Sequence, residues 1–143
     1  MRASPNLCWI GVLLVIWAGS IASWASEATP TQLKQFTIKD RVRGLEWLRC
    51  SVGQVWNGYT CIGNARLLSL SEARQAEVLA GKELGGRWRL PTSEELQTLV
   101  CAACPPPKID RRLYPNTMAA PYWTASKNRW SVGRYWTVNF YTG

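Results

Sequence analysis

Residues 85–99, with the sequence GGRWRLPTSEELQTL, constrain the fold more than any other stretch of the chain. Trp88 and Leu90 alternate with arginines, which is the period-two pattern of a half-buried strand, and the proline that follows disfavours helix before it. Thr92 and Glu95 then have the spacing of a capping box, in which each side chain accepts a hydrogen bond from the other residue's backbone N–H. This stretch predicts a short strand over 87–90 and then an amphipathic helix of about three turns.

Short strands surround two helices in the predicted order of elements. Ser69 and Glu72 have a second capping-box spacing, which predicts another helix that Gly81 ends. Asn-Gly at 57–58 is the preferred pair for a type I′ turn and predicts a hairpin over 54–61. The other expected strands cover residues 36–38, 45–50, 122–126 and 135–141. Strands, then two helices, then strands indicate the α+β class.

The first 25 residues have the pattern of a secretory signal peptide. Arg2 precedes an apolar run over 7–18, and small residues stand just before Ser26 at the expected cleavage point. A retained membrane anchor is the alternative, but the run is shorter than the ~20 residues that a membrane span needs. We therefore expect export to the periplasm or outside the cell, no stable membrane insertion after cleavage, a flexible tether over 26–35 and one domain over 36–143.

The chain is strongly basic, with 17 Lys and Arg against 9 Asp and Glu and a net charge of +8. Only Arg2 of these lies in the expected signal peptide, so the exported part keeps +7. This charge favours anionic partners, although solubility explains it equally well. We expect no nucleic-acid partner, because the basic residues are scattered and an exported protein rarely meets nucleic acid. The absence of histidine excludes Ser-His-Asp and Cys-His catalysis and the usual histidine-based metal sites.

Four cysteines follow the expected signal peptide. Cys50 and Cys61 flank the predicted hairpin, and a disulfide between them would contribute ~2–3 kcal/mol in an exported chain. Cys101 and Cys104 have CxxC spacing, which fits a redox dithiol or half of a metal site. Redox pairs usually open a helix, whereas this pair follows one, and no second CxxC or histidine completes a metal site. We therefore expect structural disulfides, local or with other partners, and no metal or cofactor.

Several blocks of the sequence resemble the Lcl C-terminal domain family of secreted bacterial domains. The central block is WRLPT followed by SEEL at 88–96. The others, in family order across about residues 36–143, are GLEW with RCSVGQ, WNGYTCIG, SEA, YPNT, YWTAS and WTVNF. The resemblance implies an α+β, C-type-lectin-like fold with two helices packed on small antiparallel sheets. Family members continue into a further strand, whereas this chain stops at Gly143, so we expect the final strand to be lacking and the chain to be a truncated or degenerate copy with an unpaired sheet edge.

Two activities that the resemblance suggests do not fit these residues. Calcium-dependent sugar binding needs clustered oxygen ligands, but after the signal peptide the only aspartates are Asp40 and Asp110. The RLPT motif also resembles one in the sulfatase-modifying, formylglycine-generating enzymes, which need reactive cysteines in their C-terminal part. No cysteine follows Cys104. We therefore expect a chain that is not an enzyme.

Acidic or sulfated polysaccharides are the partners that fit best, since arginine pairs with sulfate and carboxylate groups and tryptophan stacks on sugars. The tryptophans at 47, 56, 88, 123 and 136 follow strand alternation and are expected in the core, whereas Trp130 has only polar neighbours. The adhesin domain that names the family is associated with sulfated glycosaminoglycans, which supports this interpretation by resemblance. The candidate binding residues are Arg111, Arg112, Lys127, Arg129, Trp130 and Arg134. A structural or protein-interaction domain without such a ligand is the alternative, and the sequence leaves the oligomeric state open.

Overall fold

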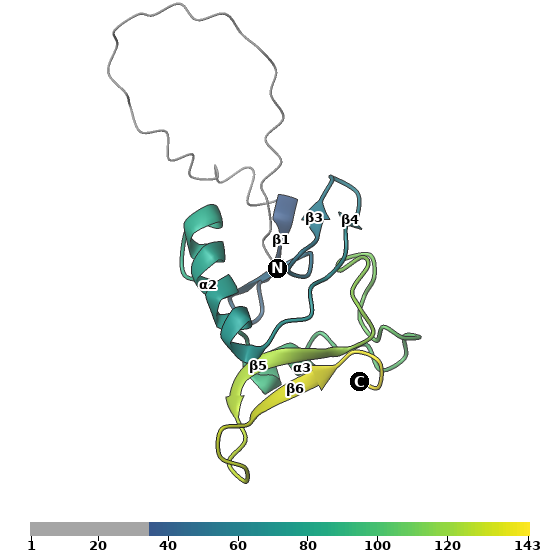
Figure 1. Cartoon of the computed structure of the whole chain (residues 1–143). Helices are drawn as coiled ribbons and strands as arrows, with labels where there is room; N and C mark the ends of the chain where they lie inside the picture. The colour runs from purple at the N-terminus through teal and green to yellow at the C-terminus, as the bar shows by residue number, and fades with distance from the viewer. Residues whose placement is uncertain (1–34) are drawn as a thin grey trace, which may run out of the picture.

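The computed structural model describes residues 35–143, so the predicted signal peptide and nearly all of the predicted tether lie outside the described residues. Three antiparallel pairs of strands and two helices make up this part of the chain. The pairs are β1 (Thr37–Asp40) with β2 (Leu45–Leu48), β3 (Val55–Trp56) with β4 (Cys61–Ile62), and β5 (Pro121–Lys127) with β6 (Tyr135–Asn139); the helices are α2 (Leu70–Leu84) and α3 (Ser93–Gln97). Figure 1 shows the β5–β6 hairpin in the lower part of the domain, with β1, β3 and β4 above it. The α+β class is confirmed.

Helix α2 begins at the predicted capping box but does not end where the sequence suggested. The Ser69 hydroxyl accepts the N–H of Glu72 at 3.3 Å, and the Glu72 carboxylate accepts the N–H of Ser69 at 2.8 Å. The predicted stop at Gly81 is wrong, because the helix continues to Leu84 and its C-cap is Gly85 with φ 72°. One glycine inside a helix costs only about 1 kcal/mol. The helix therefore runs through it until a positive φ is required.

Residues 87–90 form no strand, in contrast to the prediction. The Leu90 N–H donates to the carboxylate of Glu77 on α2 rather than to a neighbouring strand. The Pro91 carbonyl accepts one bond from the Ala125 N–H of β5 at 2.7 Å. Alternation alone specifies an extended chain, and no strand within residues 35–143 forms a ladder with this segment.

Helix α3 begins at the other predicted capping box and is shorter than the expected three turns. Its N-cap Thr92 and Glu95 exchange the two capping bonds at 3.2 and 2.8 Å. The N–H groups of residues 98–100 bond carbonyls three residues earlier, at 3.1 Å each. This is 3₁₀ geometry, which seldom extends beyond a few residues. Val100 then pairs with Ile109 in an isolated β-bridge, so the chain leaves the helix there.

The core lies between α3, the β5–β6 hairpin and the loop around residues 109–114. Its buried side chains are Leu96, Ile109, Tyr114, Val138 and Phe140. The rings of Tyr122 and Phe140 meet edge to face with centroids 5.2 Å apart.

The side chain of Trp136 lies outside this core, with 47% of the residue exposed. The sequence grouped it with Val138 and Phe140 in the core, but these two side chains are buried, whereas Trp136, near the turn end of β6, is exposed. Trp47 packs against the core, and Trp56, Trp88 and Trp123 are half-buried.

Strand β6 pairs with β5 alone, and no further strand follows it within residues 35–143. The Lys108 N–H donates to the Phe140 carbonyl at 2.6 Å, just beyond the end of β6. This bond joins the segment around Lys108 to the β5–β6 hairpin, at the end of the hairpin opposite its turn. The C-type-lectin-like part of the fold prediction continues to rest on the resemblance.

Candidate functional site

The turn between β5 and β6 carries four of the six predicted ligand-binding residues. Hydrogen bonds within the turn fix its backbone: the Asn128 N–H donates to the Arg134 carbonyl at 2.8 Å, and the Trp130 N–H donates to Asn128 Oδ1 at 2.9 Å. Gly133 has a φ of 78°, a conformation that a side chain would disfavour. The turn is thus a defined loop that presents Lys127, Arg129, Trp130 and Arg134 together.

The side chains of this turn point away from the protein body. Trp130 is 91% exposed. Within residues 35–143 the ion pairs join Arg43 to Asp40, Arg89 to Glu95 and Arg112 to Asp110. Each of these pairs lies outside the turn. The side chains of Lys127, Arg129 and Arg134 therefore enter none of the ion pairs or side-chain hydrogen bonds of the described part, and their charges are available to an anion. We call Lys127, Arg129, Trp130 and Arg134 the turn cluster.

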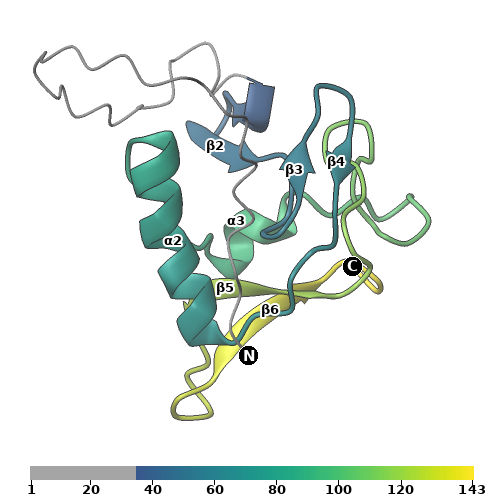
Figure 2. The same ribbon diagram turned by 45° about the horizontal axis from the view of Figure 1, so that its top comes forward.

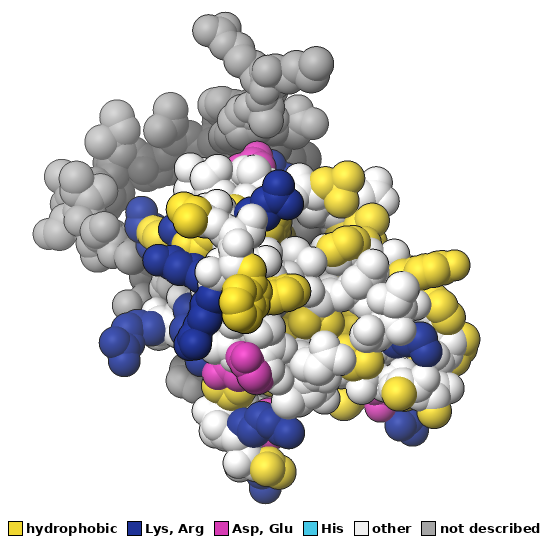
Figure 3. Space-filling model, turned by 90° about the horizontal axis from the view of Figure 1, so that it is seen from below, with side chains coloured by type: hydrophobic (Ala, Val, Ile, Leu, Met, Phe, Trp, Pro, Cys, Tyr) yellow, Lys and Arg dark blue, Asp and Glu magenta, His cyan; other side chains and the backbone are white. Residues whose placement is uncertain are grey.

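Arg74 of α2 lies beside the turn cluster and was not among the predicted residues. Its Nη2 donates to the Tyr135 hydroxyl at 2.7 Å, and its guanidinium lies 5.1 Å from the centre of that ring. Arg74 enters none of the ion pairs within residues 35–143, so it adds a positive charge next to the first residue of β6. The two residues are 61 positions apart, and no sequence signal connects them. In Figure 3, which views the face below the hairpin, dark blue basic side chains gather on one side together with exposed hydrophobic ones.

Arg111 and Arg112 lie at the other end of the hairpin and are already engaged. Arg112 holds Asp110 with two hydrogen bonds of 3.2 and 3.1 Å. This pairing raises the pKa of Arg112 and lowers the pKa of Asp110. Arg111 donates to the Pro106 carbonyl. Their segment follows Lys108, which bonds the end of β6 away from the turn. The structure therefore does not bring these two arginines together with the turn cluster.

Residues 36–143 match the model of the Lcl C-terminal domain. This chain belongs to the Lcl C-terminal domain family. The resemblance seen in the sequence blocks is thereby confirmed. No curated protein and no solved structure matches the sequence significantly.

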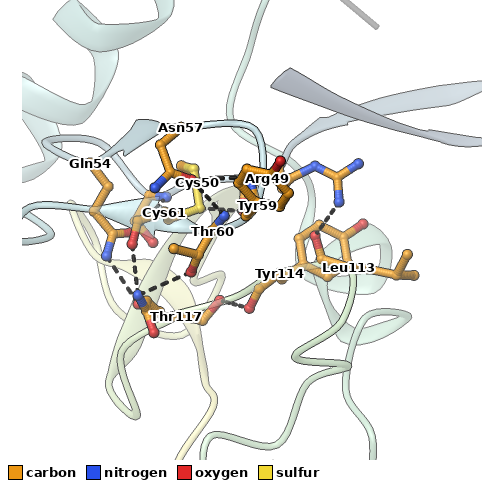
Figure 4. The surroundings of a disulfide bond; sticks show 12 residues. Arg49, Cys50, Gln54, Asn57, Tyr59, Thr60, Cys61, Leu113, Tyr114 and Thr117 are labelled. Atoms are coloured by element: carbon orange, nitrogen blue, oxygen red, sulfur yellow. Dashed lines mark hydrogen bonds between the residues drawn. A yellow bond between two sulfur atoms is a disulfide. The ribbon is translucent and has the colours of Figure 1, made fainter. Parts of the chain in front are cut away.

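The first disulfide of this Lcl C-terminal domain joins Cys50 to Cys61, with an S–S distance of 2.05 Å (Figure 4). It closes the β3–β4 hairpin, as predicted. The Asn116 side chain donates to the Cys61 carbonyl at 2.7 Å, and Gln54 donates to the Asn116 carbonyl at 3.1 Å. The hairpin is thus tied to the loop that follows the core residue Tyr114.

The second disulfide joins Cys101 to Cys104, whose Cα atoms are 5.3 Å apart. The structural disulfide expected for this CxxC pair is therefore local. Within residues 35–143, no group of three or more Cys, Asp or Glu side chains could hold a metal ion. In the same range no helix is long and apolar enough to cross a membrane.

Proposed function

We propose that this Lcl C-terminal domain is an exported, non-enzymatic module that binds acidic or sulfated polysaccharides through the turn cluster. The observation that carries the proposal is the combination of three unpaired basic side chains with an almost fully exposed tryptophan on one loop. A tryptophan exposed to this extent contributes little to folding, and its neighbours leave room for a sugar ring against its face.

The chemistry of the turn cluster suits a polyanion. Arg129 and Arg134 can each form paired hydrogen bonds to a sulfate or carboxylate group, and Lys127 adds a point charge at the base of the turn. Because backbone bonds already hold the loop, a ligand would lose less affinity to ordering it than with a loose loop. Arg74 extends the positive surface toward α2.

We expect Arg111 and Arg112 to contribute less than the turn cluster. A sulfate group would have to compete with Asp110 for Arg112 and with the Pro106 carbonyl for Arg111. Their position away from the turn also means that only a long polysaccharide could contact both regions at once.

The two disulfides support export to the periplasm or the cell exterior, since such bonds persist in oxidising compartments. They also leave no free thiol in residues 35–143 for nucleophilic chemistry. Together with the lack of histidine, this supports a binding role rather than an enzymatic one.

The test is to replace Arg129 and Arg134 by alanine and to measure heparin affinity at low and physiological salt. We expect about tenfold weaker binding and a flatter salt dependence, as two partly screened ion pairs are removed. The matched control replaces Lys39 and Arg41, exposed residues on the β1 side of the domain, and removes the same charge. Equal losses of heparin affinity in both variants would show that the effect comes from net charge alone. That result would favour a structural or protein-interaction domain.

A further inference from the structure

A pocket of about 930 Å³ lies between α2 and the rest of the domain. Helix α2 forms one wall, and residues from β2, the 84–91 segment, α3 and β5 form the others. Figure 2 shows α2 as a separate layer beside these elements. The volume is within the roughly 300–1,000 Å³ that is usual for small-molecule sites.

The sequence of α2 explains why this space is not filled. The residues that α2 turns toward the pocket include Ala73, Ala76 and Ala80, which share one face of the helix. The larger apolar side chains of the helix lie on its outer side, where Val78 is 60% and Leu79 is 54% exposed. Glu77 and Leu84 complete the lining from α2, and the small side chains between them do not fill the space between the helix and the opposite walls.

Aromatic side chains dominate the opposite walls of the pocket. Trp47, Trp88 and Trp123 all line it and are only half-buried. The indole N–H of Trp88 donates to the Gly85 carbonyl at 2.9 Å, and that of Trp123 donates to the Leu68 carbonyl at 2.7 Å. These two rings therefore have their polar edges satisfied and offer apolar surface to an occupant.

The lining holds four arginines, Arg49, Arg66, Arg87 and Arg89, against three glutamates, Glu46, Glu77 and Glu95, so its charge is positive by one. Glu46 accepts a hydrogen bond from the hydroxyl of Thr37. The Glu77 carboxylate accepts the Leu90 N–H, and Glu95 is paired with Arg89. Arg66 and Arg87 also line the pocket, are exposed, and have no side-chain hydrogen bond or ion pair within residues 35–143.

Two further donors in the lining lack acceptors. The Trp47 Nε1 and Arg49 Nε groups are buried without a hydrogen-bond partner. Both belong to residues that line the pocket, two positions apart on one face of β2 and its continuation. The two buried side-chain groups without a partner in the described residues are therefore both donors.

We propose that this pocket binds a free, single-chain carboxylic amphiphile of the fatty-acid class. The apolar chain lies against the tryptophans and the alanine face of α2, and the carboxylate pairs with Arg66 or Arg87. A neutral hydrocarbon would leave the arginines uncompensated, whereas a sugar would lose its water against apolar walls. The site is separate from the turn cluster and does not depend on polysaccharide binding.

The experiment uses the full chain, with palmitate and a stearate carrying bromine on its chain as probes. Bromine quenches tryptophan on contact, so the pocket tryptophans should be quenched and palmitate should reverse the quenching by competition. Ala80→Leu fills the pocket and should weaken binding at least tenfold while the melting temperature stays equal or rises. Val78→Ala, on the outer side of the same helix, is the control and should bind normally.

A second variant removes the charges of the two arginines and introduces no larger side chain that the fold must accommodate. Replacing Arg66 and Arg87 by glutamine should weaken palmitate binding about tenfold and leave hexadecanol, the uncharged analogue, unchanged. The single variants identify which arginine holds the carboxylate. Absence of quenching in the unmodified chain would overturn the proposal, as would undiminished binding to a folded Ala80→Leu variant. Binding to phosphatidylcholine vesicles with none to monomeric palmitate would overturn it as well.

Discussion

Replacing Glu95 by glutamine should destabilise the domain in a pH-dependent way. The Glu95 carboxylate accepts two hydrogen bonds from Arg89, at 2.8 and 2.7 Å, and one from the Thr92 N–H at 2.8 Å. It thereby joins the segment before α3 to the first turn of that helix. The bonds from Arg89 contribute most to lowering the pKa of Glu95 from 4.5 to about 2. Glutamine keeps the shape of the side chain and removes the charge.

The magnitude follows from this shift in pKa. A difference of this size between folded and unfolded chains corresponds to at most about 3 kcal/mol. The Arg89 side chain is 54% exposed, so water and salt screen the pair, and we expect about 1–2 kcal/mol. Because the folded pKa is the lower one, the contribution is present above pH 4.5 and is lost as the pH falls toward 2.

Urea unfolding of the unmodified chain and of Glu95→Gln at pH 7 and pH 3 measures this contribution. The variant should be about 1–2 kcal/mol less stable at pH 7, and the difference should shrink by more than half at pH 3. Glu83→Gln, at an exposed position on α2 that enters no ion pair within residues 35–143, is the control and should change little. A difference that is the same at both pH values would refute the electrostatic reasoning.

Three further predictions concern the core, the disulfide and alkaline pH. Phe140→Ala should cost about 3–5 kcal/mol in urea unfolding because the side chain is 1% exposed, whereas Tyr141→Ala next to it should cost under about 0.5 kcal/mol. Replacing both Cys50 and Cys61 by serine should cost roughly 3 kcal/mol, and an unchanged unfolding midpoint would contradict this. Burial raises the pKa of Tyr114 to about 12, so stability should fall as the pH rises from 10 to 12, and a Tyr114→Phe variant should lose less stability over that range.

Local signals in the sequence predicted the starts of the helices better than their ends. Both capping boxes form as expected because each depends on residues three positions apart. The end of α2 depends on where a positive φ is needed, and the end of α3 depends on the bridge between Val100 and Ile109. That bridge comes from tertiary structure and leaves no local signal.

The candidate sites also contain one part that local sequence predicts and another part that depends on tertiary structure. The turn cluster was predictable because its four residues are adjacent in sequence, between two strands with clear patterns. The contribution of Arg74 and the separation of Arg111 and Arg112 from the turn were not, since both depend on how distant segments pack. The pocket also escaped prediction, because a helix with alanines on one face and larger residues on the other indicates nothing about which face turns inward.

The most direct test of the proposed function is a thermal melt of oxidised residues 26–143 with dextran sulfate and with uncharged dextran. The two polymers share a backbone and differ in the sulfate groups. Our account predicts a cooperative transition that dextran sulfate raises, more at low than at physiological salt, and that dextran does not change. A cooperative transition that is the same in both polymers would contradict polysaccharide binding and would leave the positive charge as a contribution to solubility.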